Sequence, residues 1–500
     1  MHGTCSDLDL RNQRKPRPAR LAACLVTALG LAGVDTPALA NTVYPLACGD
    51  PAAPIFPTLR STIASALNGD TVDLSKLNCA TPSLITLAQG EINILQSNLT
   101  IYSPPGSPFT IDAAGQSRIF EHKGAGVLAL QHLRLTNGIA QPTSYSGLGG
   151  CVGSSGSLEL TYTNITGCTA KEGGGLYSAG HTKLIHSIVS GNTAKADNGA
   201  ALGGGIFAGG YLTVKYSSII NNHSEVSVGG AYALGNITTK LAVISGNTDN
   251  LYAVNLLACT ALTTTGSLNM TSTSVEGNYG QQPSSTICAG TTIDLNATTV
   301  SGNLCNPFGS YAVNAPSSNS TVTLTNSTIS GNLCNGVGVD RSVVKIFNST
   351  IAFNGGKGVV GAFCYFEANS SIISNNNTYF PPSNLTGADV YLNFCTTQDP
   401  NSNSTFVDND VIVHSNVVFP GATTIISSDP RLAPLASHGG PVKTHALSPN
   451  SPAVDAGNNL TGQANDARGA GFVREVGAAA DIGAYERQAN DDEIFYGGFN

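Results

Sequence analysis

The sequence predicts an all-β fold, a right-handed parallel β-helix in which short strands stack coil upon coil. The first observation is a six-residue phrase that recurs along the chain at Ser187–Asn192, Ala242–Asn247, Thr273–Asn278, Thr298–Asn303 and Ser327–Asn332. With its degenerate copies, the marker position (glycine in most) falls at residues 167, 191, 221, 246, 277, 302, 331, 353 and 375. These markers are 22 to 31 residues apart, a period typical of a solenoid.

The second observation is a β-branched residue two positions before every marker. The nine residues are Ile165, Val189, Ile219, Ile244, Val275, Val300, Ile329, Ile351 and Ile373. Ser and Thr often flank them, which is the alternation of a half-buried strand. The glycine and asparagine that follow tolerate positive φ, so we expect them to turn the corner. Asparagines stacked at one repeat spacing are expected to form amide ladders.

Two further strand classes complete each repeat. Upstream runs are predicted at Ser157–Thr161, Tyr211–Lys215, Thr291–Leu295 and Thr321–Thr325, and Gly-rich runs at Gly173–Tyr177, Gly203–Phe207 and Gly229–Tyr232. Strands this short cannot close a core alone. Stacking the coils about 4.8 Å apart pairs each strand with its copies and buries the β-branched column.

The N-terminus predicts export. Residues 1–40 combine a basic segment, the apolar stretch Leu21–Val34 and a small-residue cleavage site before Asn41, as in a signal peptide. The remaining chain has 18 Lys and Arg against 28 Asp and Glu, a net charge of −10, and no further apolar stretch of membrane-spanning length. This acidity argues against nucleic acid and anionic membranes as partners.

Ten cysteines follow the signal peptide, and an exported chain keeps them oxidised. Their order predicts the pairs Cys48–Cys79, Cys151–Cys168, Cys259–Cys288, Cys305–Cys334 and Cys364–Cys395. Four of the five separations are 29 to 31 residues, close to one coil, which brings Cα atoms to disulfide distance. The alternative is that some are buried thiols; metal ligation is disfavoured because no Cys-x-x-Cys motif occurs.

The start of the chain resembles secreted bacterial right-handed β-helix proteins. The resemblance rests on Phe56–Arg60, Ile63–Ala66, Asn68–Asp73, Asn98–Tyr102 and Thr110–Gly115. It implies a short capping helix before the first coil, within a β-helix spanning residues 41–428. The repeats are similar to those of chlamydial polymorphic outer-membrane proteins.

Residues 429–487 resemble a choice-of-anchor Q domain. The matching segments are Asp429–Pro430, Gly439–Pro441, Thr444–Leu447, Ser451–Gly457, Asp466–Gly469 and Asp481–Glu486. The resemblance implies a C-terminal capping domain on an exported, surface-attached protein. Residues 488–500 then either carry a sorting signal or form a frayed end.

Catalytic residues are not assigned. Between residues 131 and 390, ten acidic residues are scattered at about one per coil: Glu159, Glu172, Asp197, Glu225, Asp249, Glu276, Asp294, Asp340, Glu367 and Asp389. Polysaccharide hydrolysis or elimination needs convergent carboxylates or a carboxylate-bound Ca²⁺ with a base. Asp249 and Glu276, 27 residues apart, are the candidate pair, and Asp294 is expected on another face.

Other side chains leave alternatives open. His181, His186 and His223 are interpreted as solvated or capping residues rather than catalytic bases. Tyr177, Phe207 and Tyr232 form either an outer strip that stacks sugar rings or an internal aromatic stack, and the internal stack is favoured. Asp455, Asp466, Arg468, Asp481 and Glu486 form either a Ca²⁺ site or an Asp–Arg bridge, and the bridge is favoured. No other cofactor is predicted.

Together these patterns predict an exported, non-catalytic β-helix, secreted or at a bacterial cell surface or outer membrane, that acts in adhesion or in polysaccharide or matrix binding. The rivals are a polysaccharide lyase or glycoside hydrolase on the same scaffold, and a structural spacer without a ligand. Neither the ligand nor the oligomeric state follows from the sequence.

Overall fold

The computed structural model describes residues 40–79, 83–140, 147–196, 201–250, 259–281, 284–306, 309–378, 389–395, 411–413, 425–426, 428–489 and 491. The chain divides into two units, Met1–Leu39 and Ala40–Asn500, and the described residues all belong to the second. The predicted signal peptide therefore lies outside the described residues, except for Ala40. Of the predicted tail, only residues 488, 489 and 491 are described.

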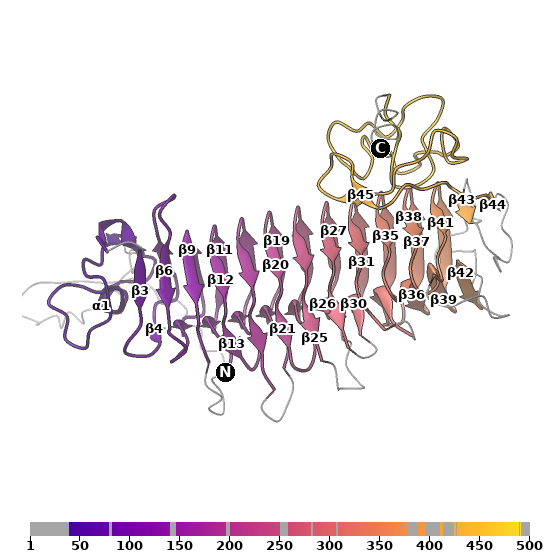
Figure 1. Ribbon diagram of the computed structural model, residues 1–500. Coiled ribbons are helices and arrows are strands. Elements are labelled where there is room, and N and C mark those ends of the chain that lie inside the picture. The colour runs from indigo at the N-terminus through magenta and orange to yellow at the C-terminus, as the bar shows by residue number, and fades with distance from the viewer. Residues whose placement is uncertain are drawn as a thin grey trace, which may run out of the picture. The chain divides into compact units, whose positions relative to one another are not determined.

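The described chain forms a parallel β-helix, which confirms the predicted fold class (Figure 1). Each coil passes through sheets I, II and III in turn, and five coils add a corner strand of sheet IV between sheets II and III.

Sheet I contains β1 (Thr42–Val43), β2 (Thr71–Asp73), β5 (Leu99–Tyr102), β8 (Val127–Gln131), β11 (Ser157–Thr161), β15 (Thr182–Ile185), β19 (Leu212–Lys215), β23 (Ile237–Lys240), β27 (Leu268–Thr271), β31 (Thr292–Asn296), β34 (Thr321–Thr325), β37 (Val343–Phe347) and β40 (Tyr365–Asn369). Sheet II contains β3 (Leu84–Thr86), β6 (Phe109–Asp112), β9 (Leu133–Thr136), β12 (Asn164–Thr166), β16 (Ile188–Ser190), β20 (Ser218–Ile220), β24 (Val243–Ser245), β28 (Ser274–Glu276), β32 (Thr299–Ser301), β35 (Thr328–Ser330), β38 (Thr350–Ala352), β41 (Ile372–Ser374), β43 (Val411–Val413) and β44 (Ile425–Ile426). Sheet III contains β4 (Ile92–Ile94), β7 (Phe120–His122), β10 (Val152–Ser154), β14 (Leu176–Ser178), β18 (Ile206–Ala208), β22 (Ala231–Ala233), β26 (Cys259–Thr264), β30 (Ser285–Ala289), β33 (Tyr311–Ala315), β36 (Asn335–Asp340), β39 (Val359–Ala362) and β42 (Val390–Asn393). Sheet IV contains β13 (Thr169–Ala170), β17 (Thr193–Ala194), β21 (His223–Ser224), β25 (Thr248–Asp249) and β29 (Tyr279–Gly280).

The repeated phrase forms the sheet II strand and the corner after it. All nine β-branched residues before the markers are fully buried, as predicted. All nine markers have positive φ, from 54° at Asn221 to 68° at Gly167, and even Phe353 adopts 56°. The marker alone makes the left-handed turn, so the prediction that the following asparagine shares it is wrong, whereas the amide ladder predicted for these asparagines is confirmed.

That asparagine points inward and forms the amide ladder. Along Asn192, Asn222, Asn247, Asn278, Asn303, Asn332, Asn354 and Asn376, each side-chain Nδ2 donates to the next Oδ1 at 2.8–3.0 Å. The last amide donates to the buried carboxylate of Asp389 at 3.0 Å. Because every amide dipole points the same way, its positive end meets an anion, as at a helix N-terminus.

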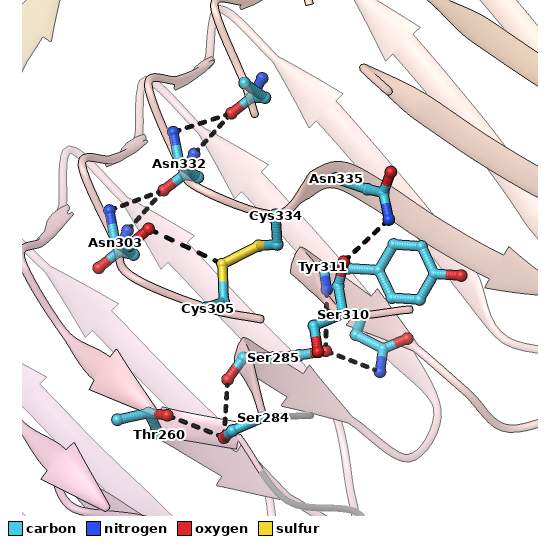
Figure 2. The surroundings of a disulfide bond; sticks show 12 residues. Thr260, Ser284, Ser285, Asn303, Cys305, Ser310, Tyr311, Asn332, Cys334 and Asn335 are labelled. Carbon is cyan, nitrogen blue, oxygen red and sulfur yellow. Dashed lines mark hydrogen bonds between the residues drawn. A yellow bond between two sulfur atoms is a disulfide. The ribbon is translucent and has the colours of Figure 1, made fainter. Parts of the chain in front are cut away.

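All five predicted disulfides are present. Their Cα–Cα distances are 5.5 Å for Cys48–Cys79, 5.5 Å for Cys151–Cys168, 5.6 Å for Cys259–Cys288, 5.3 Å for Cys305–Cys334 and 4.3 Å for Cys364–Cys395. Figure 2 shows Cys305 and Cys334 joining two successive coils beside the ladder residues Asn303 and Asn332.

The N-terminal cap contains α1 (Leu59–Ser65) and the 3₁₀ turn η1 (Leu74–Lys76). Thr58 and Ser61 form a reciprocal capping box at the start of α1. Arg60 holds the cap together, since its guanidinium pairs with the buried Asp50 at 2.7 Å. The short helix implied by the family resemblance is therefore observed.

The C-terminal region, residues 428–491, contains little regular structure within its described part, where β45 (Ala436–Ser437) pairs with β46 (Lys443–Thr444). It packs on the flank of sheet II beside the last coils (Figure 1). Hydrogen bonds join Thr299 to Lys443 and Asn348 to Asn458 at 2.7 and 2.8 Å. A separate apolar cluster around Ile372, Leu447 and Tyr485 covers part of this contact.

Candidate functional site

The outer face of sheet III carries one residue per coil in strict register. The column runs Asn93, Glu121, Gly153, Tyr177, Phe207 and Tyr232. These side chains point outward because their strand neighbours, such as Phe120 and His122 around Glu121, are buried. Along this column, a charged residue is followed in the next coil by a glycine, which has no side chain, and then by three aromatic residues in the next three coils.

The three aromatic residues of the column stack on the outside of the β-helix. Ring centroids are 5.2 Å apart between Tyr177 and Phe207 and 5.3 Å between Phe207 and Tyr232. The favoured prediction of an internal stack is thus wrong, because the inward positions of these strands hold Leu176, Ile206 and Ala231. Stacked rings cover one another's faces. The face of Tyr177 toward Gly153 has no side chain of that column opposite it.

Gly153 creates a gap between Glu121 and Tyr177. The gap is a cavity of about 230 Å³ whose lining includes Arg118, Glu121, Gly153, Ser155 and Tyr177, and we call it the notch. A Cβ at position 153 would approach Arg118 Nη1 to 3.2 Å and the Leu148 carbonyl to 2.8 Å. A side chain at position 153 would therefore press on the Leu148 backbone and on Arg118, which forms the floor of the notch.

Two carboxyl groups share this arginine. Arg118 Nη1 lies 3.6 Å from Glu91 Oε2 and 3.5 Å from Glu121 Oε1, and Lys123 approaches Glu121 at 3.5 Å. Burial and a hydrogen bond with Glu121 raise the pKa of Glu91. Burial alone would raise the pKa of Glu121 too, but the Glu91 hydrogen bond, Arg118 and Lys123 outweigh it and lower that pKa.

This cluster was not predicted, because Glu91 and Glu121 both precede residue 131, where the predicted acidic candidates begin. Glu91 and Glu121 are 30 residues apart, the same one-coil spacing that predicted the disulfides. The same spacing rule, applied earlier in the chain, would have found them.

The predicted pair Asp249 and Glu276 does not converge. Asp249 lies on β25 of sheet IV, fully buried, and accepts a hydrogen bond from Ser284. Glu276 ends β28 of sheet II and binds Lys443 at 2.6 Å. Asp294 lies on sheet I, a different face from Glu276 as predicted. Asp197 lies outside the described residues.

The three candidate histidines make structural contacts. His186 stacks between Tyr162 and Tyr216 at 4.7 and 4.9 Å, in a ladder at the corner between sheets I and II. His181 stacks on Tyr211 at 3.5 Å, and His223 bonds Thr248 at 2.8 Å.

A second cavity, of about 680 Å³, lies between sheet II and the C-terminal region. It is bounded by two residues that break the repeat, Glu276 in place of serine and Phe353 in place of glycine. Within it, Ser330 Oγ lies 2.7 Å from His445 Nε2, and His445 Nδ1 lies 2.7 Å from the Ala433 carbonyl. Nδ1 therefore carries the proton and Nε2 accepts from Ser330.

Burial lowers the pKa of His445 to about 4, so this imidazole is neutral at pH 7. The contacts resemble a serine–histidine pair, but Ser330 is only 2% exposed and the Gly331 amide next to it is bonded to Ala352. The backbone amide beside Ser330 is therefore not free to stabilise an oxyanion. His445 serves to fasten the C-terminal region to sheet II.

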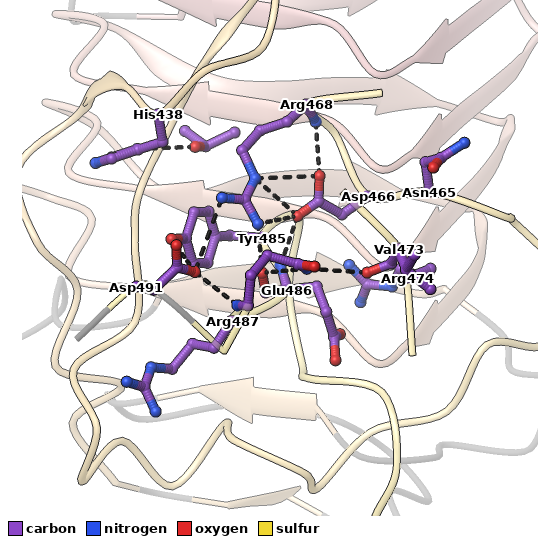
Figure 3. Close-up of polar contacts among 12 residues, drawn as sticks. His438, Asn465, Asp466, Arg468, Val473, Arg474, Tyr485, Glu486, Arg487 and Asp491 are labelled. Atoms are coloured by element: carbon purple, nitrogen blue, oxygen red, sulfur yellow. Dashed lines mark hydrogen bonds and ion pairs between the residues drawn. The ribbon is translucent and has the colours of Figure 1, made fainter. Parts of the chain in front are cut away.

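The carboxylates of the C-terminal region bind arginine and backbone amides (Figure 3). Asp466 and Arg468 form the predicted bridge at 2.8 Å with both side chains fully buried. Asp481 accepts from the amides of Asp455 and Arg487, and Glu486 from those of Val476 and Asp481. Burial raises the pKa of Glu486 to about 8.

Two findings bear on ligands and membranes. Within the described ranges, no group of three His, Cys, Asp or Glu side chains is placed to hold a metal ion. In the same part of the chain, no helix has the length and apolarity to cross a bilayer.

Comparison with known proteins assigns no family to this chain. No family model and no curated protein matches the chain, so the resemblances to the choice-of-anchor Q domain and to the chlamydial repeats stay predictions. Among solved structures, pectate lyase Pel9A matches with a TM-score of 0.38 and 13% identity, over 90% of this chain and 96% of that chain. No residue role is carried over at this level of similarity.

Proposed function

We propose that the chain is an exported β-helix that binds polysaccharide on the outer face of sheet III without cleaving it. The observation that carries the proposal is the notch, where the ring of Tyr177 faces Glu121 across the empty position of Gly153. Two coil spacings, about 10 Å, separate these walls. A sugar ring between them would place its C–H groups on the aromatic face and its hydroxyls at the carboxyl.

Five disulfides support an extracellular location, because such bonds persist in oxidising compartments. The same proposal includes attachment to a bacterial surface through a sorting signal in residues 488–500. Adhesion would follow from polysaccharide binding if the bound polymer belongs to another cell or a matrix.

The second candidate is a polysaccharide-degrading enzyme, and the raised pKa of Glu91 favours it, since a general acid must hold a proton near neutral pH. The geometry argues against it. Glu91 is not among the residues that line the notch, and both carboxyls contact Arg118 Nη1, at 3.6 and 3.5 Å, whereas the two carboxyls of a glycosidase flank the bond being cleaved.

A glycan array probed with residues 41–500 tests the proposal, together with assays for new reducing ends and unsaturated products. We expect binding without cleavage, and at least tenfold weaker binding by Tyr177→Ala. Tyr216→Ala is the matched control, because Tyr216 is also a stacked, 47% exposed ring but lies away from the notch. Cleavage of any polymer would establish the enzyme instead, and no binding to any glycan would favour a spacer.

A further inference from the structure

We infer that the notch binds a single sugar unit at the end of a chain, rather than a unit within the chain. The inference rests on the proposed function and concerns the same site. It depends on the directions in which a sugar ring held in the notch could continue into a polymer.

Along the axis of the β-helix, the notch has room for one sugar ring. Its walls, Glu121 and Tyr177, are two coil spacings apart, about 10 Å, and carbon atoms in contact lie about 3.5–4 Å apart. Behind Tyr177 the column offers no second stacking face, because the Tyr177 and Phe207 rings lie 5.2 Å apart and Phe207 is only 8% exposed. A polymer therefore cannot continue from the notch along the aromatic column.

Along the strand direction, the notch is closed at the end where β10 begins. Leu148 lines this end, and its carbonyl oxygen would lie 2.8 Å from a Cβ at position 153. The turn at Gly149, with a φ of 69°, folds the chain back on β10, and Leu148 is fixed there by a parallel β-bridge to Glu172 of the next coil. The Leu148 side of the notch is therefore a closed end.

The opposite end of the notch is lined by small side chains, Ser155 and Ala179, which follow β10 and β14. A ring lying flat against Tyr177 directs its substituents toward this end, toward Leu148, toward the floor or into solvent. Arg118 closes the floor, so the Ser155 end and the solvent side are the open directions. A unit within a 1,4-linked chain needs exits at opposite positions of its ring, whereas a terminal unit needs one exit and fits.

Titration calorimetry at pH 7 tests the inference with β-1,4-linked oligomers of glucose, mannose and xylose, each from two to six units long. We expect the affinity per chain to change less than twofold with length, because each chain presents one end that fits. Leu148→Ala shortens the side chain at the closed end and should admit internal units. Its affinity should therefore rise at least threefold from two to six units.

Leu202→Ala is the matched control, because Leu202 occupies the position of Leu148 two coils later, in the same row of β-bridges, but is not part of the notch lining. It should leave the length dependence unchanged. An affinity of the unchanged protein that rises in proportion to chain length, and is lost in Tyr177→Ala, would overturn the inference and leave the proposed function standing. The inference would also fail if none of the three series bound. Binding that Tyr177→Ala does not weaken would overturn both.

Discussion

The coils and the C-terminal region are stabilised in different ways. In the coils, each strand forms hydrogen bonds with the equivalent strand of the next coil. The asparagine ladder repeats one side-chain hydrogen bond along eight asparagines. In the C-terminal region, the described residues form one strand pair, β45 with β46, and two isolated bridges, Leu432–Leu447 and Asn465–Val473. Single buried contacts such as Asp466–Arg468 and Ser330–His445 take the place of a ladder.

This difference predicts where damage spreads. A coil residue shares its contacts with both neighbouring coils, so its loss is felt along the stack, as in other solenoids. A residue of the C-terminal region contacts that region and the flank of sheet II, and no strand ladder carries its loss along the stack. Its removal should leave the coils folded.

The largest effect is expected from Arg468→Met. Arg468 forms an ion pair with Asp466, and its Cζ lies 3.9 Å from the centre of the Tyr485 ring. Its loss leaves the buried carboxylate of Asp466 without a partner cation. Breaking such a pair costs about 3–5 kcal/mol. Hydrogen exchange should show residues 428–489 opening while the amides of sheet I stay protected. Arg431→Met, at an exposed arginine of the same region, is the control, and equal effects of the two variants would refute this account.

Asn332→Ala should cost about 3 kcal/mol, because it removes bonds to Val300 and Asn354 and leaves the amide of Asn303 without its acceptor. In chemical unfolding, the denaturant midpoint of the variant should fall in a single transition, and no part of the β-helix should stay folded beyond it. The control Asn269→Ala alters an exposed asparagine of sheet I. A loss confined to one coil in hydrogen exchange would show that the ladder is not cooperative.

Acid should weaken the contact that His445 makes between the C-terminal region and sheet II. Glu486, whose pKa burial raises to about 8, acts in the opposite direction as the pH falls, so the His445 contribution is measured by comparison with a His445 variant. Burial lowers the pKa of His445 from 6.5 to about 4, so the neutral form stabilises the fold above pH 6.5, and this stability is lost as the pH falls toward 4. Linkage gives a loss of about 2 kcal/mol at pH 5. His438, whose pKa is lowered chiefly by burial, adds in the same direction. Hydrogen exchange at pH 7.5 and pH 5 on the unchanged chain and on His445→Gln isolates the His445 contribution, because the difference between the two proteins should shrink at pH 5. An equal difference at both pH values would contradict it.

Tyr216→Ala should have the smallest effect, about 1 kcal/mol or less, because Tyr216 ends the corner ladder and stacks only on His186. Thermal unfolding of the variant and of Tyr216→Phe measures it. A loss of more than about 2 kcal/mol in the free energy of unfolding would mean that the aromatic stack of Tyr162, His186 and Tyr216 stabilises the coils more than its exposed position suggests.

Much of the coil architecture could be predicted, because register repeats in the sequence. The β-branched column, the positive-φ markers and the cysteine pairs all follow from one spacing. The same spacing links Glu91 to Glu121, and the alternation along β14 places Tyr177 opposite the buried Leu176, so both were within reach of the sequence. The cavity beside Glu276 was not, since Lys443 lies 167 residues away in a region without a repeat.

The most direct test of the central claim is hydrogen exchange of the mature chain with and without a bound neutral oligosaccharide. We predict added protection in β7, β10 and β14, which carry Glu121, Gly153 and Tyr177, and no change in β28, β32 and β35. Protection confined to the sheet II strands beside Glu276 and His445 would contradict the assignment of the binding site to the notch.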